Sequence, residues 1–151
     1  LDRLINPHVS DLPAFLVSQP GVNSGMMITQ YVAASLCAQN RQLAQPAVLD
    51  NYVTSALQED HLSLGTNAAL KLLQVLENAT QVLAIEYLLA AQAFEFHQPK
   101  HFGAGTQVAW RLLREHVAPY DQDRWLAPDI AKSAAILKDP HALQPLAAYL
   151  A

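Results

Sequence analysis

The stretch ALQEDHLSLGTNAALKLLQVLENATQVLAIEYLLAAQAFEF, residues 56–96, contains no proline and a single glycine, Gly65. Its apolar residues recur at spacings of three and four, which is the period of an α-helix. They point several ways around the axis, and a helix that is apolar on most sides is buried on most sides. The stretch therefore predicts one long central helix, with a possible break at Gly65 because glycine is a weak helix former.

The rest of the sequence shows the same helical period between its prolines. No window alternates apolar and polar residues as a half-buried strand does. We therefore expect an all-α fold, a bundle around the long central helix that is closed by short helices. Further helices are predicted over 24–43, 106–117, 129–137 and 142–150, after a short opening helix or turn that ends near Pro7. Asn23 or Ser24 is expected to cap the first of these and Thr106 the second.

Composition limits the classes of function. The chain has 151 residues, of which 52% are hydrophobic and only 15% charged, so we expect apolar surface that is covered in an oligomer. A net charge of −4 gives no basic stripe for phosphates, which argues against nucleic acid as a partner. The single Cys37 cannot form an internal disulfide and favours a cytoplasmic location, and we expect its thiol to be buried and structural.

Neither a signal peptide nor a membrane span is predicted. Residues 12–40 carry no charge, but Pro20 and Gly21 interrupt them, which leaves fewer than the about eighteen apolar residues that a span needs. The chain begins at Leu1 without an initiator methionine, so we expect residues 1–151 to be one helical domain from the C-terminal part of a larger chain.

Few residues suggest a metal site or a nucleophile. His97 and His101 have a helical ligand spacing, but Pro99 lies between them and no third ligand completes a tetrahedral site, so no metal is expected. Trp110 and Trp125 are expected to be core or interface aromatics.

The quartet Gln58 to His61 has two interpretations. As structure, Ser55 and Gln58 form a capping box, and Glu59 and Asp60 lie in the first helical turn, where carboxylates meet the positive end of the helix dipole. As chemistry, a carboxylate beside an amide at a helix N-terminus suits a polar, hydrogen-bonding substrate. Spacing alone does not decide between them.

Five stretches together carry a family resemblance. They are NSG at 23–25, TSALQEDHLS at 54–63, LEN at 76–78, VLAIE at 82–86 and DRWLAPDI at 123–130. In this order they resemble the C-terminal part of the histidine ammonia-lyase family, which belongs to the aromatic amino acid ammonia-lyases. The resemblance implies a mostly helical homotetramer whose subunits, each with the remainder of the lyase chain, share active sites for a small amino acid substrate. Histidine loses ammonia there and becomes urocanate.

The resemblance also implies a prosthetic electrophile and a substrate-facing carboxylate. The family forms 4-methylidene-imidazol-5-one from its own Ala-Ser-Gly, a tripeptide that is absent from this sequence, where Asn23 precedes the only Ser-Gly. We therefore expect the electrophile to come from a part of the lyase that precedes this chain, and this chain alone to be inactive. The family's substrate-facing glutamate falls on Glu59, the expected catalytic residue, with Gln58 as a weaker substrate-binding neighbour.

One departure from the family pattern concerns the substrate. The family has asparagine in place of Leu57, and losing that amide removes a polar contact near the substrate. Phenylalanine or tyrosine ammonia-lyase, or an aminomutase with the same prosthetic group, therefore remains an alternative. A second alternative, of another class, is a non-catalytic helical assembly module.

Overall fold

The computed structural model describes residues 1–97 and 102–149, and within these ranges it is helical with no β-strand. The prediction of an all-α fold is confirmed. In chain order the elements are α1 (Asp2–Ile5), α2 (Pro7–Ser10), the 3-10 helix η1 (Ala14–Leu16), α3 (Met27–Leu43), α4 (Gly65–Phe94), α5 (Ala104–Arg114), α6 (Ala127–Lys138), α7 (Pro140–Leu143) and the 3-10 helix η3 (Gln144–Tyr149). None of the helices in the described ranges is both long and apolar enough to span a bilayer.

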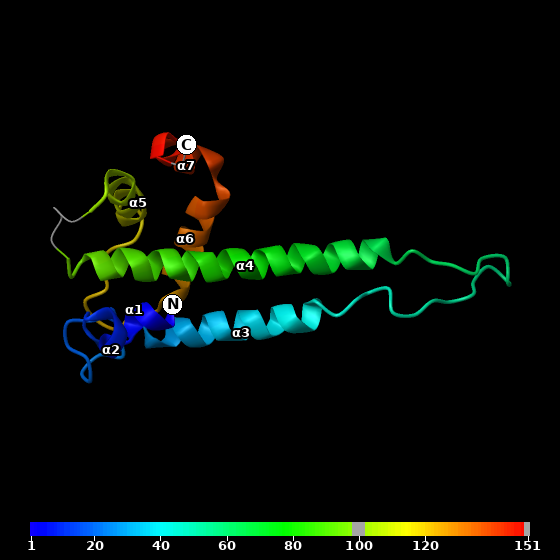
Figure 1. The fold of residues 1–151 in the computed structure, drawn as a ribbon, viewed down its shortest axis with the longest axis horizontal. Coiled ribbons are helices and arrows are strands. Elements are labelled where there is room, and N and C mark those ends of the chain that lie inside the picture. The colour runs from blue at the N-terminus through cyan, green and yellow to red at the C-terminus, as the bar shows by residue number, and fades with distance from the viewer. Residues whose placement is uncertain (98–101, 150–151) are drawn as a thin grey trace.

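Two long antiparallel helices set the shape of the molecule. α3 and α4 lie side by side, and the loop that joins them projects from one end of the pair (Figure 1). The short helices gather around the opposite end, where α4 also packs against α6. The molecule therefore has a compact end, built on the C-terminal half of α4, and an extended end that carries residues 44–64.

The long helix begins later than the sequence predicts. α4 starts at Gly65, so the predicted break is the actual beginning, and the capping box at Ser55 and Gln58 is wrong. The cause is backbone conformation, because Leu64 has a φ of 49° and Ser55 to Leu57 also have positive φ, which a right-handed helix excludes. The hydroxyl of Ser63 instead accepts the backbone N–H of Gly65 at 3.3 Å.

The other predicted helix starts need smaller corrections. α3 begins at Met27 without a side-chain cap, so the expected caps at Asn23 or Ser24 are wrong. α5 begins after Gly103, which places Thr106 inside the helix rather than at its cap. The last predicted helix is divided into α7 and η3 (Gln144–Tyr149), and its final residue Leu150 lies outside the described residues.

The hydrophobic core lies at the compact end. Its fully buried members come from η1, α4 and α5, and include Leu16, Ile85, Leu88, Leu89 and Leu113. Burying one such side chain stabilises the fold by about 1.5–3 kcal/mol. The sequence predicted burial on most sides along the whole helix, but the buried apolar residues of α4 begin at Ala84, with Leu88 and Leu89 among them.

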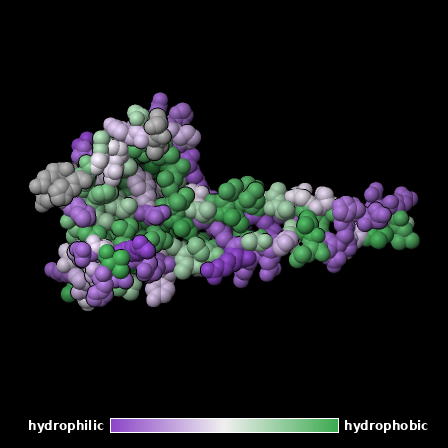
Figure 2. Space-filling model, viewed as in Figure 1, coloured by the Kyte–Doolittle hydropathy of each residue, from purple (hydrophilic) through white to green (hydrophobic). Residues whose placement is uncertain are grey.

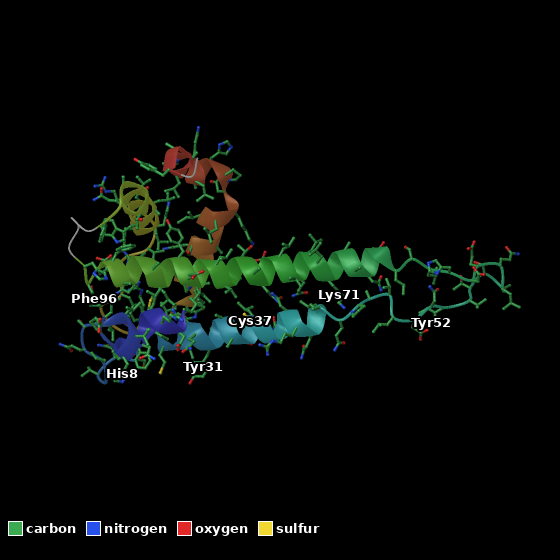
Figure 3. All side chains as sticks on the ribbon, viewed as in Figure 1. His8, Tyr31, Cys37, Tyr52, Lys71 and Phe96 are labelled. Carbon is green, nitrogen blue, oxygen red and sulfur yellow. The ribbon has the colours of Figure 1, made fainter. Side chains whose placement is uncertain are left out.

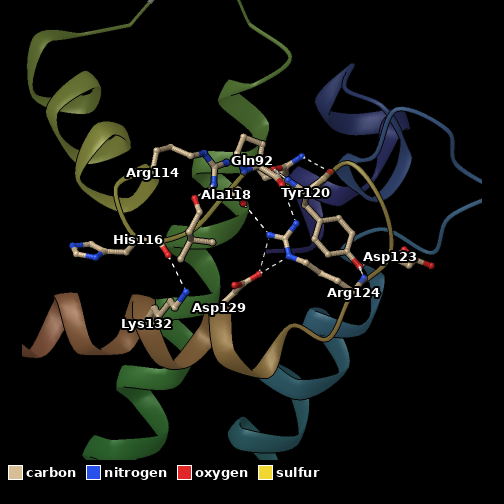
Figure 4. Close-up of polar contacts among 11 residues, drawn as sticks. Gln92, Arg114, His116, Ala118, Tyr120, Asp123, Arg124, Asp129 and Lys132 are labelled. Carbon is tan, nitrogen blue, oxygen red and sulfur yellow. Dashed lines mark hydrogen bonds and ion pairs between the residues drawn. The ribbon is translucent and has the colours of Figure 1, made fainter.

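A buried amide links η1, α5 and the segment after α5 to α4. Gln92 donates from Nε2 to the carbonyl of Leu16 at 3.1 Å and to that of Tyr120 at 3.0 Å. Its Oε1 accepts the backbone N–H of Tyr120 at 2.9 Å and a guanidinium N–H of Arg114 at 3.3 Å (Figure 4). Leaving such buried groups unpaired would cost about 1–3 kcal/mol each, so Gln92 fixes the segment after α5 against α4.

A carboxylate joins the start of α3 to the segment before α6. Asp123 accepts the backbone N–H groups of Ser24 at 2.8 Å and Gly25 at 3.0 Å. Its own N–H donates to Oδ1 of Asn23 at 3.2 Å. Gly25 has a φ of 61°, and a Cβ there would lie 2.6 Å from the carbonyl oxygen of Phe15, so only glycine fits this junction.

Much of the apolar surface of the two long helices is exposed. Beyond the compact end, apolar side chains lie along α4 in the space-filling view (Figure 2). The exposed ones on α3 and α4 are Ile28, Tyr31, Val32, Leu70, Leu72, Leu73, Leu76 and Leu83. The central helix is thus buried on several sides at its C-terminal half only, and its N-terminal half leaves leucines uncovered in this chain.

The cysteine differs from its predicted burial, and the two tryptophans differ from each other. Cys37 on α3 is exposed, so the expectation of a buried structural thiol is wrong for this chain. Trp110 packs against the core cluster, whereas Trp125 is 79% exposed in this chain, so its prediction as an interface aromatic stays a prediction.

The exposed leucines predict self-association. We expect residues 1–151 alone to form oligomers or aggregates at micromolar concentration, because each leucine that becomes buried gains about 1.5–3 kcal/mol. Leu73→Lys with Leu76→Lys should disperse them, as sedimentation velocity would show. Gln74→Lys, an exposed polar neighbour on α4, adds charge without removing apolar surface and should leave association nearly unchanged. A well-dispersed wild-type monomer would contradict the prediction.

The Asp123 junction predicts a pH dependence of stability. The backbone N–H of Ser24, followed by that of Gly25, holds the pKa of Asp123 below its ordinary value of 3.8, against the effect of burial. A depressed folded pKa stabilises the fold above the unfolded value and the gain is lost as pH falls through the folded value. Asp123→Asn should therefore unfold at lower urea than wild type near pH 7, and the difference should vanish in strong acid. Asp121→Asn is the matched control, and equal effects of both variants would refute this role.

Candidate functional site

The predicted site residues lie on the loop that connects α3 to α4. This loop, residues 44–64, extends beyond the ends of both helices, and Tyr52 on it lies far from His8 and Phe96 at the compact end (Figure 3). Leu57, Gln58 and Glu59 are all exposed, and the side chain of Leu57 is 86% exposed. The chain thus presents these three residues together, on a segment that stands away from its own core.

A pair of backbone hydrogen bonds closes the tip of the loop. The N–H of Thr54 donates to the carbonyl of Glu59 at 2.9 Å, and the N–H of Glu59 donates to the carbonyl of Thr54 at 3.2 Å. The turn between them is bridged by the N–H of Gln58, which donates to the carbonyl of Ser55 at 3.2 Å. The backbone of Glu59 is therefore held by bonds in both directions.

The turn inside that pair is strained. Ser55, Ala56 and Leu57 have φ values of 55°, 53° and 71°, in the left-handed region. Each non-glycine residue there costs about 1–2 kcal/mol relative to the right-handed conformation. Strain of this kind gathers at functional sites, where the surrounding structure holds it in place.

The helix-dipole interpretation of the quartet is wrong for this structure. α4 begins at Gly65, so Glu59 and Asp60 precede its first turn, and the dipole effect falls off within that turn. Both carboxylates are exposed on a loop. What remains of the two interpretations is a carboxylate and an amide, Glu59 and Gln58, presented by a closed turn.

Sequence reasoning missed Asn51. Its side chain bonds the backbone of Leu62 in both directions and contacts His61, across the stem of the same loop. The available signal was an asparagine after the proline-marked crossover, because asparagine side chains readily bond nearby backbone groups. That signal indicates that an asparagine side chain can bond to the backbone, but it does not identify Leu62, eleven residues away, as the partner.

The histidine pair with ligand spacing is described only in part. His101 lies outside the described residues, so the His97 and His101 spacing has no geometry here. Within the described ranges, no three His, Cys, Asp or Glu side chains lie close enough together to hold a metal ion.

The structure brings two of the resemblance-bearing stretches together. NSG at 23–25 meets the start of DRWLAPDI at Asp123, through the backbone bonds of Ser24 and Gly25. Arg124 then pairs with Asp129 at 2.9 Å within the second stretch. These contacts are structural and lie at the compact end, whereas the QEDH stretch lies at the other end of α3 and α4 (Figure 1).

Comparisons with known proteins agree with this architecture. The model of the family described as aromatic amino acid lyase matches residues 1–115. A histidine ammonia-lyase of Symbiobacterium thermophilum is 53% identical over 137 residues, which cover 91% of this chain and 27% of that protein. The chain thus spans about a quarter of the length of the curated relatives that it matches.

Solved structures show the same arrangement of helices. The crystal structure of histidine ammonia-lyase from Trypanosoma cruzi superposes with a TM-score of 0.93 at 37% identity, over 98% of this chain and 29% of that chain. Tyrosine aminomutase from Streptomyces globisporus superposes with a TM-score of 0.90 at 32% identity, over 97% of this chain and 28% of that chain. Since the family model covers most of its residues and the fold agrees, the chain belongs to the aromatic amino acid lyase family.

Proposed function

We propose that this segment supplies Glu59 to the substrate site of an ammonia-lyase that converts L-histidine to urocanate and ammonia. One observation carries the proposal: a closed, strained turn holds the backbone of Glu59 while leaving its carboxylate exposed, away from the core of its own chain. The histidine ammonia-lyases among the similar proteins support histidine as the substrate. As a carbon–nitrogen lyase, the protein would use this segment as one part of a larger site.

The chemistry of Glu59 would be recognition by charge. An ionised carboxylate accepts a hydrogen bond from an imidazole N–H or pairs with an ammonium group, and such charge-assisted bonds are about twice as strong as neutral ones. Gln58 adds an amide that both donates and accepts. Leu57 adds an apolar surface beside them. We propose these three residues as the substrate-binding contribution of this chain, with Glu59 as its catalytic residue.

The electrophile of the family does not fit the residues of this chain. Members of the family depend in general on 4-methylidene-imidazol-5-one, which forms from Ala-Ser-Gly. The only Ser-Gly here is Ser24-Gly25, which follows Asn23 and whose backbone N–H groups are bonded to Asp123. We therefore propose that another part of the lyase supplies this group.

The exposed surfaces support partners for this segment. We propose that residues 1–151 form one helical domain that packs against the remainder of the lyase chain and against other subunits in a homotetramer. The uncovered leucines of α4 and the projecting loop both support this, because each presents groups that gain from contact with another surface. A cytoplasmic location, with no nucleic acid partner, remains a prediction from the composition.

A second candidate within the family rests on Leu57. Tyrosine aminomutase is 32% identical to this chain, and an apolar side chain beside Glu59 suits an aromatic ring as well as an imidazole. A phenylalanine or tyrosine ammonia-lyase, or an aminomutase, is therefore the alternative. A non-catalytic assembly module is the alternative of another class, and it predicts that changes at Glu59 leave all activity unaltered.

Glu59 is tested by removing its charge. In a full-length lyase that carries this segment, Glu59→Gln keeps the shape of the side chain and removes the charge that the substrate meets. Losing a charge-assisted hydrogen bond of about 1.5–3 kcal/mol should lower kcat/KM for histidine by on the order of ten- to a hundredfold. Steady-state kinetics of urocanate formation measures this.

Asp60→Asn is the matched control for Glu59→Gln. Asp60 is the adjacent exposed carboxylate, and it lies just outside the Thr54–Glu59 pair that closes the turn. We expect near-wild-type kinetics for this variant. Matching, near-wild-type kinetics in both variants would contradict the role of Glu59. Activity of residues 1–151 alone would contradict the external electrophile.

Leu57 is tested by two replacements that separate its side chain from its backbone. Asparagine and glycine both tolerate a left-handed φ better than leucine, but only asparagine adds an amide. If position 57 reads the substrate, Leu57→Asn should raise the ratio of kcat/KM for histidine over phenylalanine, and Leu57→Gly should not. Equal ratios in wild type and both variants would remove Leu57 from the substrate site.

A further inference from the structure

We propose that Asn51 is the positioning residue of Glu59, a role that rests on the proposed function of Glu59 in substrate recognition. Asn51 does not touch the Glu59 carboxylate in this structure. It acts on the backbone of the loop, by closing the stem from which the Glu59 turn projects.

The side-chain amide of Asn51 bonds to the backbone of Leu62 as the backbone of a neighbouring β-strand would. Its Oδ1 accepts the backbone N–H of Leu62 at 2.8 Å, and its Nδ2 donates to the carbonyl of the same residue at 3.0 Å. One side chain therefore satisfies both backbone groups of Leu62. The Oδ1 also accepts the N–H of Tyr52 at 2.9 Å, and Nδ2 lies 3.0 Å from Nδ1 of His61.

These bonds form the outer of two closures in series. The outer one joins residues 51 and 62 through a side chain, and the inner one joins Thr54 and Glu59 through the backbone. With the ends of the loop already together, the inner pair closes a shorter free segment, which costs less conformational entropy. Without Asn51, only the inner pair would oppose the strain of three left-handed residues.

The flanking segments make this dependence local. Residues 51–53 and 60–64 belong to no helix, and Asn51 and Glu59 are both exposed, so no buried packing of this chain fixes the loop. His61 and Leu62 follow the QED stretch directly. The side chain of Asn51 thus contacts the chain two and three residues after Glu59, at His61 and Leu62. These contacts are close enough to Glu59 to set the direction in which that residue leaves the turn.

Two substitutions of Asn51 separate its two hydrogen bonds with the backbone of Leu62. Asn51→Ala removes every side-chain bond to Leu62. Asn51→Asp keeps an acceptor for the N–H of Leu62 but turns an oxygen toward its carbonyl, so half of the pairing is lost. Asn67→Asp, on the exposed first turn of α4, adds the same charge without touching the loop and serves as the matched control.

The first measurement is hydrogen exchange in a full-length lyase that carries this segment, because it reads the loop without reading activity. In Asn51→Ala, we expect the amides of both Leu62 and Glu59 to exchange at least about tenfold faster, while core amides such as that of Leu88 stay protected. Asn51→Asp should fall between wild type and Asn51→Ala. Unchanged exchange at Glu59 would overturn the proposal, whatever the activity.

The second measurement is a double-mutant cycle on kcat/KM for histidine. Asn51→Ala alone should lower kcat/KM by at least about tenfold, since a misplacement of about 1 Å can cost on the order of a hundredfold. In a Glu59→Gln background, the same change should cost less than about threefold, because the group that Asn51 positions no longer carries charge. A cost that is the same in both backgrounds would overturn the proposal and indicate a merely structural residue.

The two proposals fail in different ways. If Glu59→Gln leaves kcat/KM unchanged, the proposed function fails, and hydrogen exchange still decides whether Asn51 holds the turn. If Glu59→Gln lowers kcat/KM but Asn51→Ala has no effect, or an additive one, only the positioning role fails. Asn67→Asp should match wild type in every measurement, and a loss there would attribute any effect of Asn51→Asp to charge.

Discussion

The compact end of the molecule depends on the buried side-chain amide of Gln92. It is 2% exposed, and its hydrogen bonds tie Leu16 before α3, Arg114 of α5 and the backbone of Tyr120 to one position on α4. A buried polar network of this kind stabilises a fold only when all its members are paired. Tyr120 precedes the segment that carries Asp123, and Asp123 holds the start of α3. The start of α3 is therefore linked to α4 through this amide.

The helices could be predicted from sequence and their starts could not. Periodicity located α4, α5 and α6 because each repeats apolar residues at helical spacing. It failed before Gly65, since leucine favours a right-handed helix, yet Leu57 and Leu64 adopt left-handed backbone. Leu57 lies inside the turn that the Thr54–Glu59 bonds close, and Leu64 lies directly before α4. A local pattern contains no information about that closure.

The site could be predicted only in part, for the same reason. Glu59 and Gln58 are proposed for the site because the stretch that contains them resembles a family. Asn51 was missed because it acts on the backbone groups of Leu62, at a separation of 11 residues. Outside the site, the contacts of Asp123 with the backbone of Gly25 and Ser24 were missed for the same reason, at separations of 98 and 99 residues. Backbone groups are common to all residues, so the partner leaves no trace in the sequence.

Because α4 is long, packing at the compact end affects the position of the loop at its other end. Thirty helical residues span about 45 Å at about 1.5 Å per residue. A tilt of α4 by about 5° at the compact end would therefore move its other end by about 4 Å, more than the tolerance of about 1 Å within which a catalytic group works. Core packing around Leu88 and Leu89 therefore also sets the orientation of α4, and with it the position of the loop. Substitutions there would cost stability, and any that tilt α4 would also displace the loop.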